Sequence, residues 1–312
     1  MPEHPLHAPV LSWFGRTARD LPWRRPDVGA WGVLVSEVML QQTPVVRVEP
    51  AWRAWLARWP DPRALAADSP GEAVRAWGRL GYPRRALRLH AAAQAIVQRH
   101  GGAVPSDLAE LRALPGVGDY TAAAVAVFAF CQRRAVLDTN VRRVHARALG
   151  GTALAAPAVT AAEVRRAEGL LPDDPGVAAT WSVAVMELGA LVCTARTPRC
   201  GDCPVAGQCA WRLAGAPPYD GPRRRSQAWH GTDRQARGRL LAVLRESPGP
   251  VPPEVLRQAW TDDHVQRERA LDGLVADGLV DPLADGRYAL PSRRSRPSPP
   301  AGRRAARSSP PR

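Results

Sequence analysis

The sequence contains no lysine, because all 43 basic residues among its 312 are arginine. Without a side-chain amine, no Schiff base can form with a carbonyl or a sugar aldehyde, and every lysine-dependent mechanism is excluded. Long apolar runs are also missing, since no stretch approaches the roughly 18–20 residues of a membrane-spanning helix. The N-terminal segment lacks the apolar core and cleavage site of a secretory signal, so we expect a cytoplasmic, nucleoid-associated bacterial protein and no membrane partner.

The alternation of apolar and polar residues that marks β-strands is almost absent as well. Residues 11–211 instead hold alanine- and leucine-rich segments with helical spacing, separated by proline or glycine. This pattern predicts a mainly α protein with an all-α domain at residues 10–212. A proline- and arginine-rich linker at 213–231 follows it.

Residues 232–290 predict a second, smaller unit. Three helical segments precede a short pair of strands joined at Asp285-Gly286, a dipeptide typical of hairpin turns. This order favours a winged-helix-like domain, and a small packing domain without nucleic-acid contact is the alternative. Residues 291–312 combine seven arginines with proline and serine and hold no acid, which predicts a disordered basic tail.

The formal net charge of +14 is therefore divided equally between the tail and the remainder of the chain. A folded part that is still basic attracts polyanions, nucleic acid above all. Charge alone also fits a protein that merely carries an arginine-rich tail. The net charge therefore does not identify the binding partner.

Four of the five cysteines follow the spacing Cys-x6-Cys-x2-Cys-x5-Cys, namely Cys193, Cys200, Cys203 and Cys209. In a reducing compartment disulfides do not persist, so a metal site is favoured. Zinc usually takes two close Cys-x2-Cys pairs, whereas this stretch has one, which suits a 4Fe-4S cluster better. Zinc or free thiols remain the alternatives. Cys131 ends an apolar run and is expected to be a small buried hydrophobe.

A helical hairpin is predicted where Leu114-Pro115-Gly116-Val117-Gly118 separates two helical segments. The glycines at 116 and 118 permit a tight turn whose amides point outward at the start of the second helix. Such amides, with the helix dipole, bind phosphate independently of sequence. We therefore expect Gly116, Val117 and Gly118 to contact the DNA backbone.

Four motifs in order resemble one known family: SEVMLQQT at 36–43, LPGVGDYTA at 114–122, LDTNVRRV at 137–144 and the four cysteines. Together they resemble the helix–hairpin–helix DNA glycosylases of the endonuclease III superfamily. Within it, SEVMLQQT is similar to the adenine DNA glycosylases of the MutY type. The resemblance covers about residues 10–212 and implies a two-lobed all-α core with an iron–sulfur loop.

Two acids carry the expected chemistry. Glu37 lies in the apolar stretch WGVLVSEVML, where a buried carboxyl stays protonated to higher pH, as a general acid must. The resemblance implies that Glu37 protonates adenine N7 and that Asp138 stabilises the cationic sugar. A surface glutamate and a simple helix cap are the plain alternatives for these two residues.

Tyr120 stands where the lyase branch of the superfamily has lysine, so the resemblance implies base release without strand cleavage. Tyr120 would hydrogen-bond the catalytic carboxylate, although it would be unremarkable as a core tyrosine. Asn140 would help to orient the site.

The resemblance implies roles for further residues from their positions in the motifs. Gln42 and Tyr82 match the residues that enter DNA when a base is flipped out. Val45 and Leu80 would line the purine pocket, and Arg19 and Arg24 would lie on a segment beside it. Arg196 and Arg199, on the loop that holds the cysteines, would meet phosphate. The tryptophans at 23, 52, 55, 59 and 77 are expected in the core.

The sequence departs from the family in two places. Residues 232–290 are too short for the nucleotide-hydrolase-like domain that most such enzymes carry, which leaves open the preference for 8-oxoguanine over guanine opposite adenine. Before the cysteines, this sequence has Trp181-Ser182-Val183, where the corresponding stretch of family members commonly contains asparagine.

The implied function is a monomeric, monofunctional glycosylase that removes adenine mispaired with 8-oxoguanine or guanine in double-stranded DNA. A thymine glycosylase acting on T opposite G also carries tyrosine in the hairpin helix and is the rival enzyme. A DNA-binding regulator with a redox-sensing cluster is the non-enzymatic alternative, but it has no need for Glu37, Tyr120 and Asp138.

Overall fold

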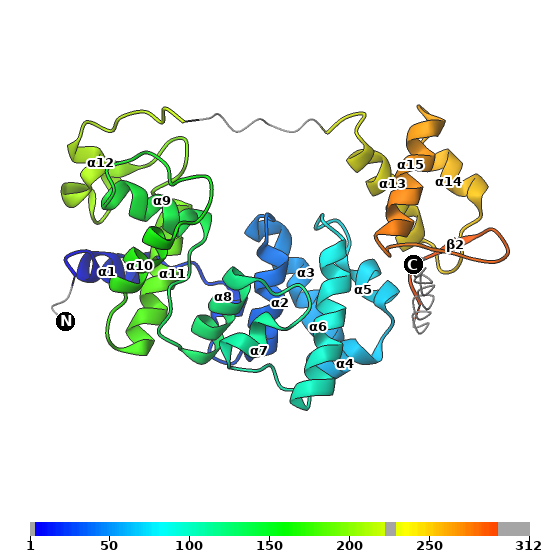
Figure 1. Ribbon diagram of the computed structural model, residues 1–312, viewed down its shortest axis with the longest axis horizontal. Coiled ribbons are helices and arrows are strands. Elements are labelled where there is room, and N and C mark those ends of the chain that lie inside the picture. The colour runs from blue at the N-terminus through cyan, green and yellow to red at the C-terminus, as the bar shows by residue number, and fades with distance from the viewer. Residues whose placement is uncertain (1–3, 222–228, 293–312) are drawn as a thin grey trace, which may run out of the picture.

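The computed structural model describes residues 4–221 and 229–292 (Figure 1). Part of the expected linker and almost all of the expected basic tail, residues 293–312, lie outside these ranges. The described part is mainly helical, as predicted. Its first helices are α1 (His7–Thr17), α2 (Ala30–Leu40), α3 (Val45–Arg58), α4 (Pro62–Ala67), α5 (Pro70–Trp77), α6 (Arg84–His100), α7 (Leu108–Arg112), α8 (Asp119–Phe130), α9 (Thr139–Ala148), α10 (Ala161–Gly169), α11 (Pro175–Leu191) and α12 (Ala210–Leu213).

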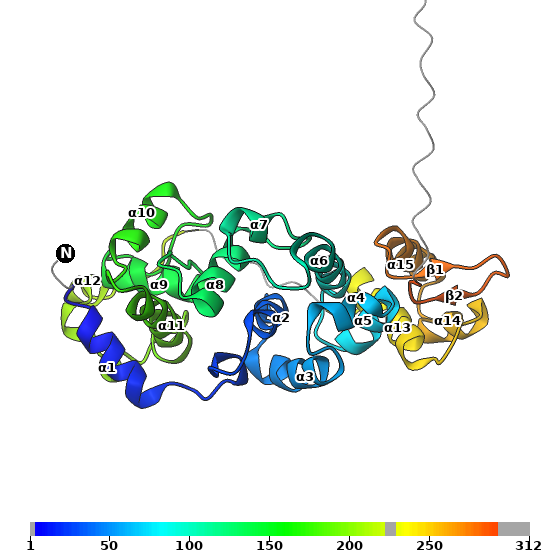
Figure 2. The ribbon, with the colours of Figure 1, turned by 90° about the horizontal axis from the view of Figure 1, so that it is seen from below.

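The helices up to α12 form two lobes with separate cores. Helices α2 to α8 contribute to one apolar cluster, which continues into residues 236–280, and α1, α9 and α11 enclose the other. Figure 2 shows α2 and α8 between the α9–α11 side and the α3–α6 side. The predicted two-lobed architecture is confirmed. The five tryptophans expected in the core are all buried there: Trp23, Trp52, Trp55, Trp59 and Trp77.

Helix α2 runs through the larger lobe and is apolar on every side, so it can only be stable when it is buried all round. From Trp31 to Met39 every residue is buried. The indole of Trp52 donates to Gly32 O at 2.9 Å and ties α3 to α2. Glu37 is therefore carried into the interior by the packing of its neighbours.

Helices α9 and α11 of the smaller lobe approach closely at Gly189. A Cβ atom at this position would lie 2.7 Å from Asn140 Cβ and 2.9 Å from Asn140 O. The guanidinium of Arg143 spans the same contact by donating to Gly189 O at 2.6 Å and to Asn140 Oδ1 at 2.7 Å. Glycine at 189 thus sets the position of Asn140.

The C-terminal unit contains α13 (Asp233–Glu246), α14 (Pro253–Ala259) and α15 (His264–Ala276), followed by β1 (Asp281–Pro282) and β2 (Tyr288–Ala289). The two strands pair antiparallel, and Val251 forms a bridge to Tyr288. The expected three helices and hairpin are therefore present, and the winged-helix class remains a prediction. Among the described residues, no helix has the length and apolar character needed to cross a membrane.

The expectation for Cys131 is wrong, because this residue is exposed. Helix α8 ends at Phe130, and Cys131 follows it in the left-handed region with φ of 51°. Its amide donates to Val127 O and closes the helix. The apolar run belongs to the buried face of α8, and the chain leaves the core one residue later.

We expect Gly189→Ala to lower the free energy of unfolding by about 2 kcal/mol, because overpacking a well-filled contact forces the helices apart. Gly169→Ala is the control, since a Cβ on this last residue of α10 meets nothing within 4 Å. Chemical denaturation of both variants measures the difference. Equal stabilities would contradict the close contact at Asn140.

Candidate active site

Three ionisable side chains meet at the seam of the two lobes. Glu37 comes from α2, Tyr120 from the first turn of α8, and Asp138 directly precedes α9. Tyr120 hydrogen-bonds Glu37, and the Asp138 charge acts on both. Residues far apart in the sequence are thus brought together, as the expected site requires.

The Glu37 side chain is buried, with 6% of the residue exposed. Burial, with a smaller contribution from the Asp138 charge, raises the pKa of Glu37 to about 7, against the opposing effects of the hydrogen bond from Tyr120 and the charge of Arg24. Burial and the nearby acids hold the pKa of Tyr120 well above its usual value, so this hydroxyl stays a donor. The site therefore offers a carboxyl that holds a proton near neutral pH.

Asp138 is both a helix cap and a member of this cluster. Its Oδ1 accepts from the amides of Asn140 at 2.8 Å and Val141 at 2.6 Å, and Oδ2 accepts from Asn140 Nδ2 at 2.8 Å. Burial raises the pKa of Asp138, while these hydrogen bonds favour the charged form. The same carboxylate thus caps α9 and lies close enough for its charge to act on Glu37.

The charge of Arg24 acts on Glu37, and both Arg19 and Arg24 are engaged by a residue that the sequence did not single out. Glu187 of α11 is fully buried and accepts from Arg19 Nη2 at 2.7 Å and Arg24 Nη2 at 2.8 Å. Burial works to raise the pKa of Glu187, but the two arginines outweigh it and lower the pKa to about 2. Glu187 is the one charged residue of α11, the same signal that marked Glu37.

The two residues expected to enter DNA share an unusual backbone conformation. Gln42 has φ of 56° and Tyr82 has φ of 46°, and both are exposed, Tyr82 to 54%. Positive φ is costly for non-glycine residues and is typical of functional turns. The two turns lie at the same edge of the molecule (Figure 1). Thr43 Oγ1 joins them by donating to Leu80 O at 3.2 Å.

Arg85 holds these two turns together, and sequence reasoning missed it. Its Nη1 donates to the carbonyls of Val38 at 2.8 Å and Gln41 at 2.6 Å, at the C-terminal end of α2. Its Nη2 donates to Gly81 O at 3.1 Å, and its guanidinium lies 5.5 Å from the centre of the Tyr82 ring. The single guanidinium group of Arg85 thus donates hydrogen bonds to backbone carbonyls of both turns.

The remaining expected residues lie next to these turns. Leu80 is buried, and Val45 is half-buried at the first position of α3. Their contact with a purine stays a prediction.

In the helical hairpin, Gly116 has φ of 80°, and a Cβ there would lie 2.7 Å from Arg88 Cβ. Gly118 precedes α8, and its amide has no hydrogen-bond acceptor in the described part of the chain. Val117 is buried and anchors the turn. This arrangement leaves an amide and a helix N-terminus available to an anion.

Comparison with known proteins identifies the family. Residues 35–167 match the HhH-GPD superfamily of base excision DNA repair proteins, and residues 193–209 match the iron–sulfur binding domain of endonuclease III. The chain is 55% identical over 290 residues to the adenine DNA glycosylase of Mycobacterium tuberculosis, covering 93% of this chain and 95% of the relative. The chain belongs to the adenine DNA glycosylase family.

A further relative agrees with this assignment, and a solved structure shares the fold. The adenine DNA glycosylase of Mycolicibacterium smegmatis is 56% identical over 281 residues, covering 90% of this chain and 94% of the relative. The solved structure of a thermostable thymine-DNA glycosylase superposes with a TM-score of 0.61 at 25% identity, covering 67% of this chain and 95% of that one. The adenine DNA glycosylase relatives thus extend across the C-terminal unit, whereas the solved structure covers only about two thirds of this chain.

The iron–sulfur loop of this family member has a donor set that fits the cluster. Its four cysteines are half-buried free thiols, and Cys203 lies within electrostatic range of the other three. Four thiols are the donor set of a cubane cluster, in which each thiolate takes its own iron. Arg147 Nη1 lies 3.4 Å from Cys193 Sγ and supplies positive charge.

The proton on Glu37 has a consequence for stability. Between the ordinary pKa of 4.5 and about 7 the folded protein holds this proton and the unfolded chain does not. The free energy of unfolding contributed by Glu37 therefore falls as the pH rises through that window. We expect Glu37→Gln to be more stable than the unaltered protein at pH 8, by about 2 kcal/mol, and equal to it near pH 4.5.

Chemical denaturation across this pH range tests the expectation. Glu168→Gln is the control, since Glu168 is exposed on α10. Parallel pH curves for Glu37→Gln and the unaltered protein would show that Glu37 is not protonated in the fold.

Arg85→Lys should loosen both turns, because an ammonium group cannot reach the carbonyls that the planar fork reaches together. We expect a loss of about 2 kcal/mol in stability and faster amide exchange at residues 41–43 and 79–82. Arg99→Lys, on the exposed face of the same helix, should change neither. Unaltered amide exchange in Arg85→Lys would show that Arg85 does not hold the two turns together.

Proposed function

We propose that this protein is an adenine DNA glycosylase of base excision repair. It hydrolyses the N-glycosidic bond of adenine mispaired with 8-oxoguanine or guanine in duplex DNA and leaves an abasic site. The observation that carries the proposal is Glu37, a carboxyl whose pKa is raised to about 7, next to Asp138. Membership of the adenine DNA glycosylase family supports the choice of base.

The chemistry follows from the two acids. Adenine is a poor leaving group until its ring is protonated, so a carboxylic acid that holds its proton near neutral pH is needed beside it. The departing base leaves a cationic sugar, which a fixed carboxylate stabilises, as in glycoside hydrolysis. Glu37 donates the proton, Asp138 faces the sugar, and water then adds to the sugar carbon and loses a proton to the Glu37 carboxylate.

The supporting residues position the two acids. Tyr120 holds the Glu37 carboxyl, and Asn140 orients Asp138 through its side-chain amide. Glu187 engages Arg19 and Arg24, so their positive charge is partly neutralised next to the pocket. With Arg24 free of this partner, the pKa of Glu37 would be lower.

The absence of lysine supports a monofunctional enzyme, because no side-chain amine can attack the sugar and cut the strand. The motif resemblance supports the same conclusion, because it aligns Tyr120 with the lysine of the lyase branch. Release of a base without strand cleavage is therefore the expected outcome.

DNA would bind as a duplex across the edge formed by the two turns and the helical hairpin. The hairpin amides hold a phosphate, while Gln42 and Tyr82 fill the gap left by the extruded adenine. Val45 and Leu80 would line the purine pocket, and the basic charge of the chain supplies general attraction, with a single copy sufficing for the site.

The four cysteines would hold the 4Fe-4S cluster, whose thiolate bonds fix the fold of the loop at 193–209. Arg196 and Arg199 lie exposed on this loop and could meet the DNA backbone. Arg199 Nη2 donates to Leu191 O at 2.8 Å, which fastens the loop to the end of α11.

The test is incubation with duplexes that contain A opposite 8-oxoguanine, A opposite G or T opposite G, followed by alkali to cleave abasic sites. We expect adenine release from the first two and no cleavage before alkali. Asp138→Asn should reduce release by at least about 1,000-fold while duplex affinity stays the same, since asparagine keeps the cap but loses the charge. Release of thymine alone would favour the thymine glycosylase.

A further inference from the structure

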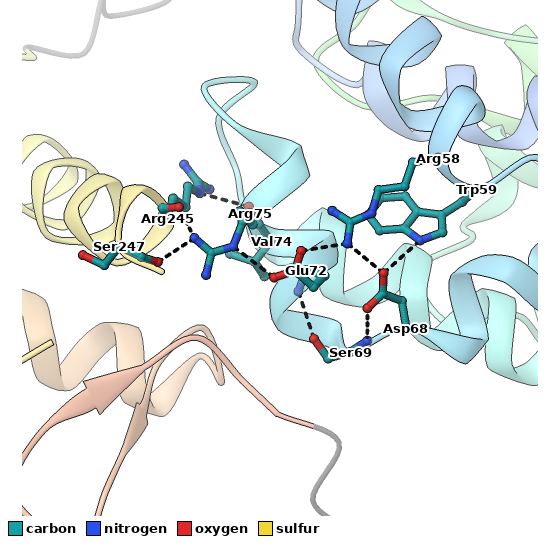
Figure 3. Close-up of polar contacts among 9 residues, drawn as sticks. All are labelled: Arg58, Trp59, Asp68, Ser69, Glu72, Val74, Arg75, Arg245 and Ser247. Atoms are coloured by element: carbon teal, nitrogen blue, oxygen red, sulfur yellow. Dashed lines mark hydrogen bonds and ion pairs between the residues drawn. The ribbon is translucent and has the colours of Figure 1, made fainter. Parts of the chain in front are cut away.

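The C-terminal unit packs against the larger lobe at helix α5 (Figure 3). Arg75 of α5 donates to Arg245 O and, at 2.8 Å, to Ser247 O, at the end of α13. Arg245 returns the contact by donating to Val74 O at 3.0 Å. Each guanidinium therefore caps carbonyl groups of the opposite unit.

Two more contacts extend this interface along the chain. At the start of α5, Gly71 N donates to Pro291 O at 2.7 Å, and a Cβ at Gly71 would lie 2.6 Å from the same oxygen. At the start of α6, Arg84 Nη1 pairs with Asp277 Oδ1 at 3.1 Å. The C-terminal unit thus contacts α5 from its first turn to its last, and then the first residue of α6.

The Tyr82 turn lies between these two points of attachment. Helix α5 ends at Trp77 and α6 begins at Arg84. The connection contains positive φ at Gly78, Gly81 and Tyr82, so its shape depends on how its two ends are held. Arg85 fixes the side of the turn that faces Gln42, and the C-terminal unit fixes the helices that enter and leave it.

We infer that the C-terminal unit is a positioning element for the Tyr82 turn, and that it governs how readily adenine is extruded from a base pair. The inference rests on the proposed function, because it concerns a step of that reaction. A turn held in its inserting shape loses less conformational entropy when it enters DNA. The unit therefore acts on extrusion and leaves the chemistry at Glu37 unchanged.

The experiment separates extrusion from chemistry in the full-length protein. Asp277→Asn removes the pair with Arg84 across the interface and also the pair with Arg237 inside the C-terminal unit. Asp272→Asn, at an exposed residue of α15, makes the same charge change and is the control. Gly71→Leu wedges the interface apart. Its control is Gly176→Leu, which follows a proline at the start of α11, where a Cβ meets only the Asp174 side chain at 3.2 Å.

Extrusion is followed by the fluorescence of 2-aminopurine placed opposite 8-oxoguanine, and chemistry by single-turnover release of adenine. Two substrates are compared, adenine paired with 8-oxoguanine and adenine opposite an abasic site, where no pair must be broken. We expect extrusion and release from the paired substrate to fall about threefold in Asp277→Asn and about tenfold in Gly71→Leu. Release from the unpaired substrate and affinity for undamaged duplex should stay within about twofold.

Other outcomes overturn the inference. An equal loss on both substrates would show a general structural defect, and unchanged extrusion would show that the interface does not reach the turn. Weaker binding to undamaged duplex would assign the unit a DNA-binding role instead. If the unaltered protein released adenine from neither substrate, the proposed function itself would fail.

Discussion

The site depends on the cost of placing the Glu37 carboxyl out of water. Helix α2 has no polar face on which this residue could lie, so packing of its neighbours carries the acid inside. A buried carboxylate is unfavourable unless it is paired, and the neighbouring Asp138 opposes the charge instead of balancing it. The proton therefore stays on Glu37. The seam between the lobes supplies the second acid, which explains why neither lobe holds a site alone.

Arginine takes up a structural role throughout this lysine-free chain. Buried guanidinium groups end helices and join elements by donating to backbone carbonyls, as Arg85 does for α2 and Arg143 does between α9 and α11. Arg75 and Arg245 do the same between the two units. A planar fork with five donors suits such carbonyl clusters, whereas an ammonium group satisfies them only partly. The positive charge of the sequence therefore serves packing as well as attraction to DNA.

Much of the fold and part of the site could be predicted from the sequence. Helical spacing predicted the all-α lobes, and the apolar setting of Glu37 predicted its burial. Glu187 is likewise a single acid in an apolar helix, α11, but it lies in none of the recognised motifs and was therefore missed. Arg85 looked like any surface arginine, since its partners are carbonyls that only folding brings together. Cys131 was misjudged because a sequence does not show at which residue a buried helix leaves the core.

The contact between Gly71 and Pro291 joins residues that lie far apart in the sequence. During synthesis the α2–α8 helices leave the ribosome long before residue 291, and domains generally fold as they emerge. The core around Glu37 can thus be assembled while one support of the Tyr82 turn is still missing. A nascent chain would acquire its buried acid early and its finished DNA-entering turn last.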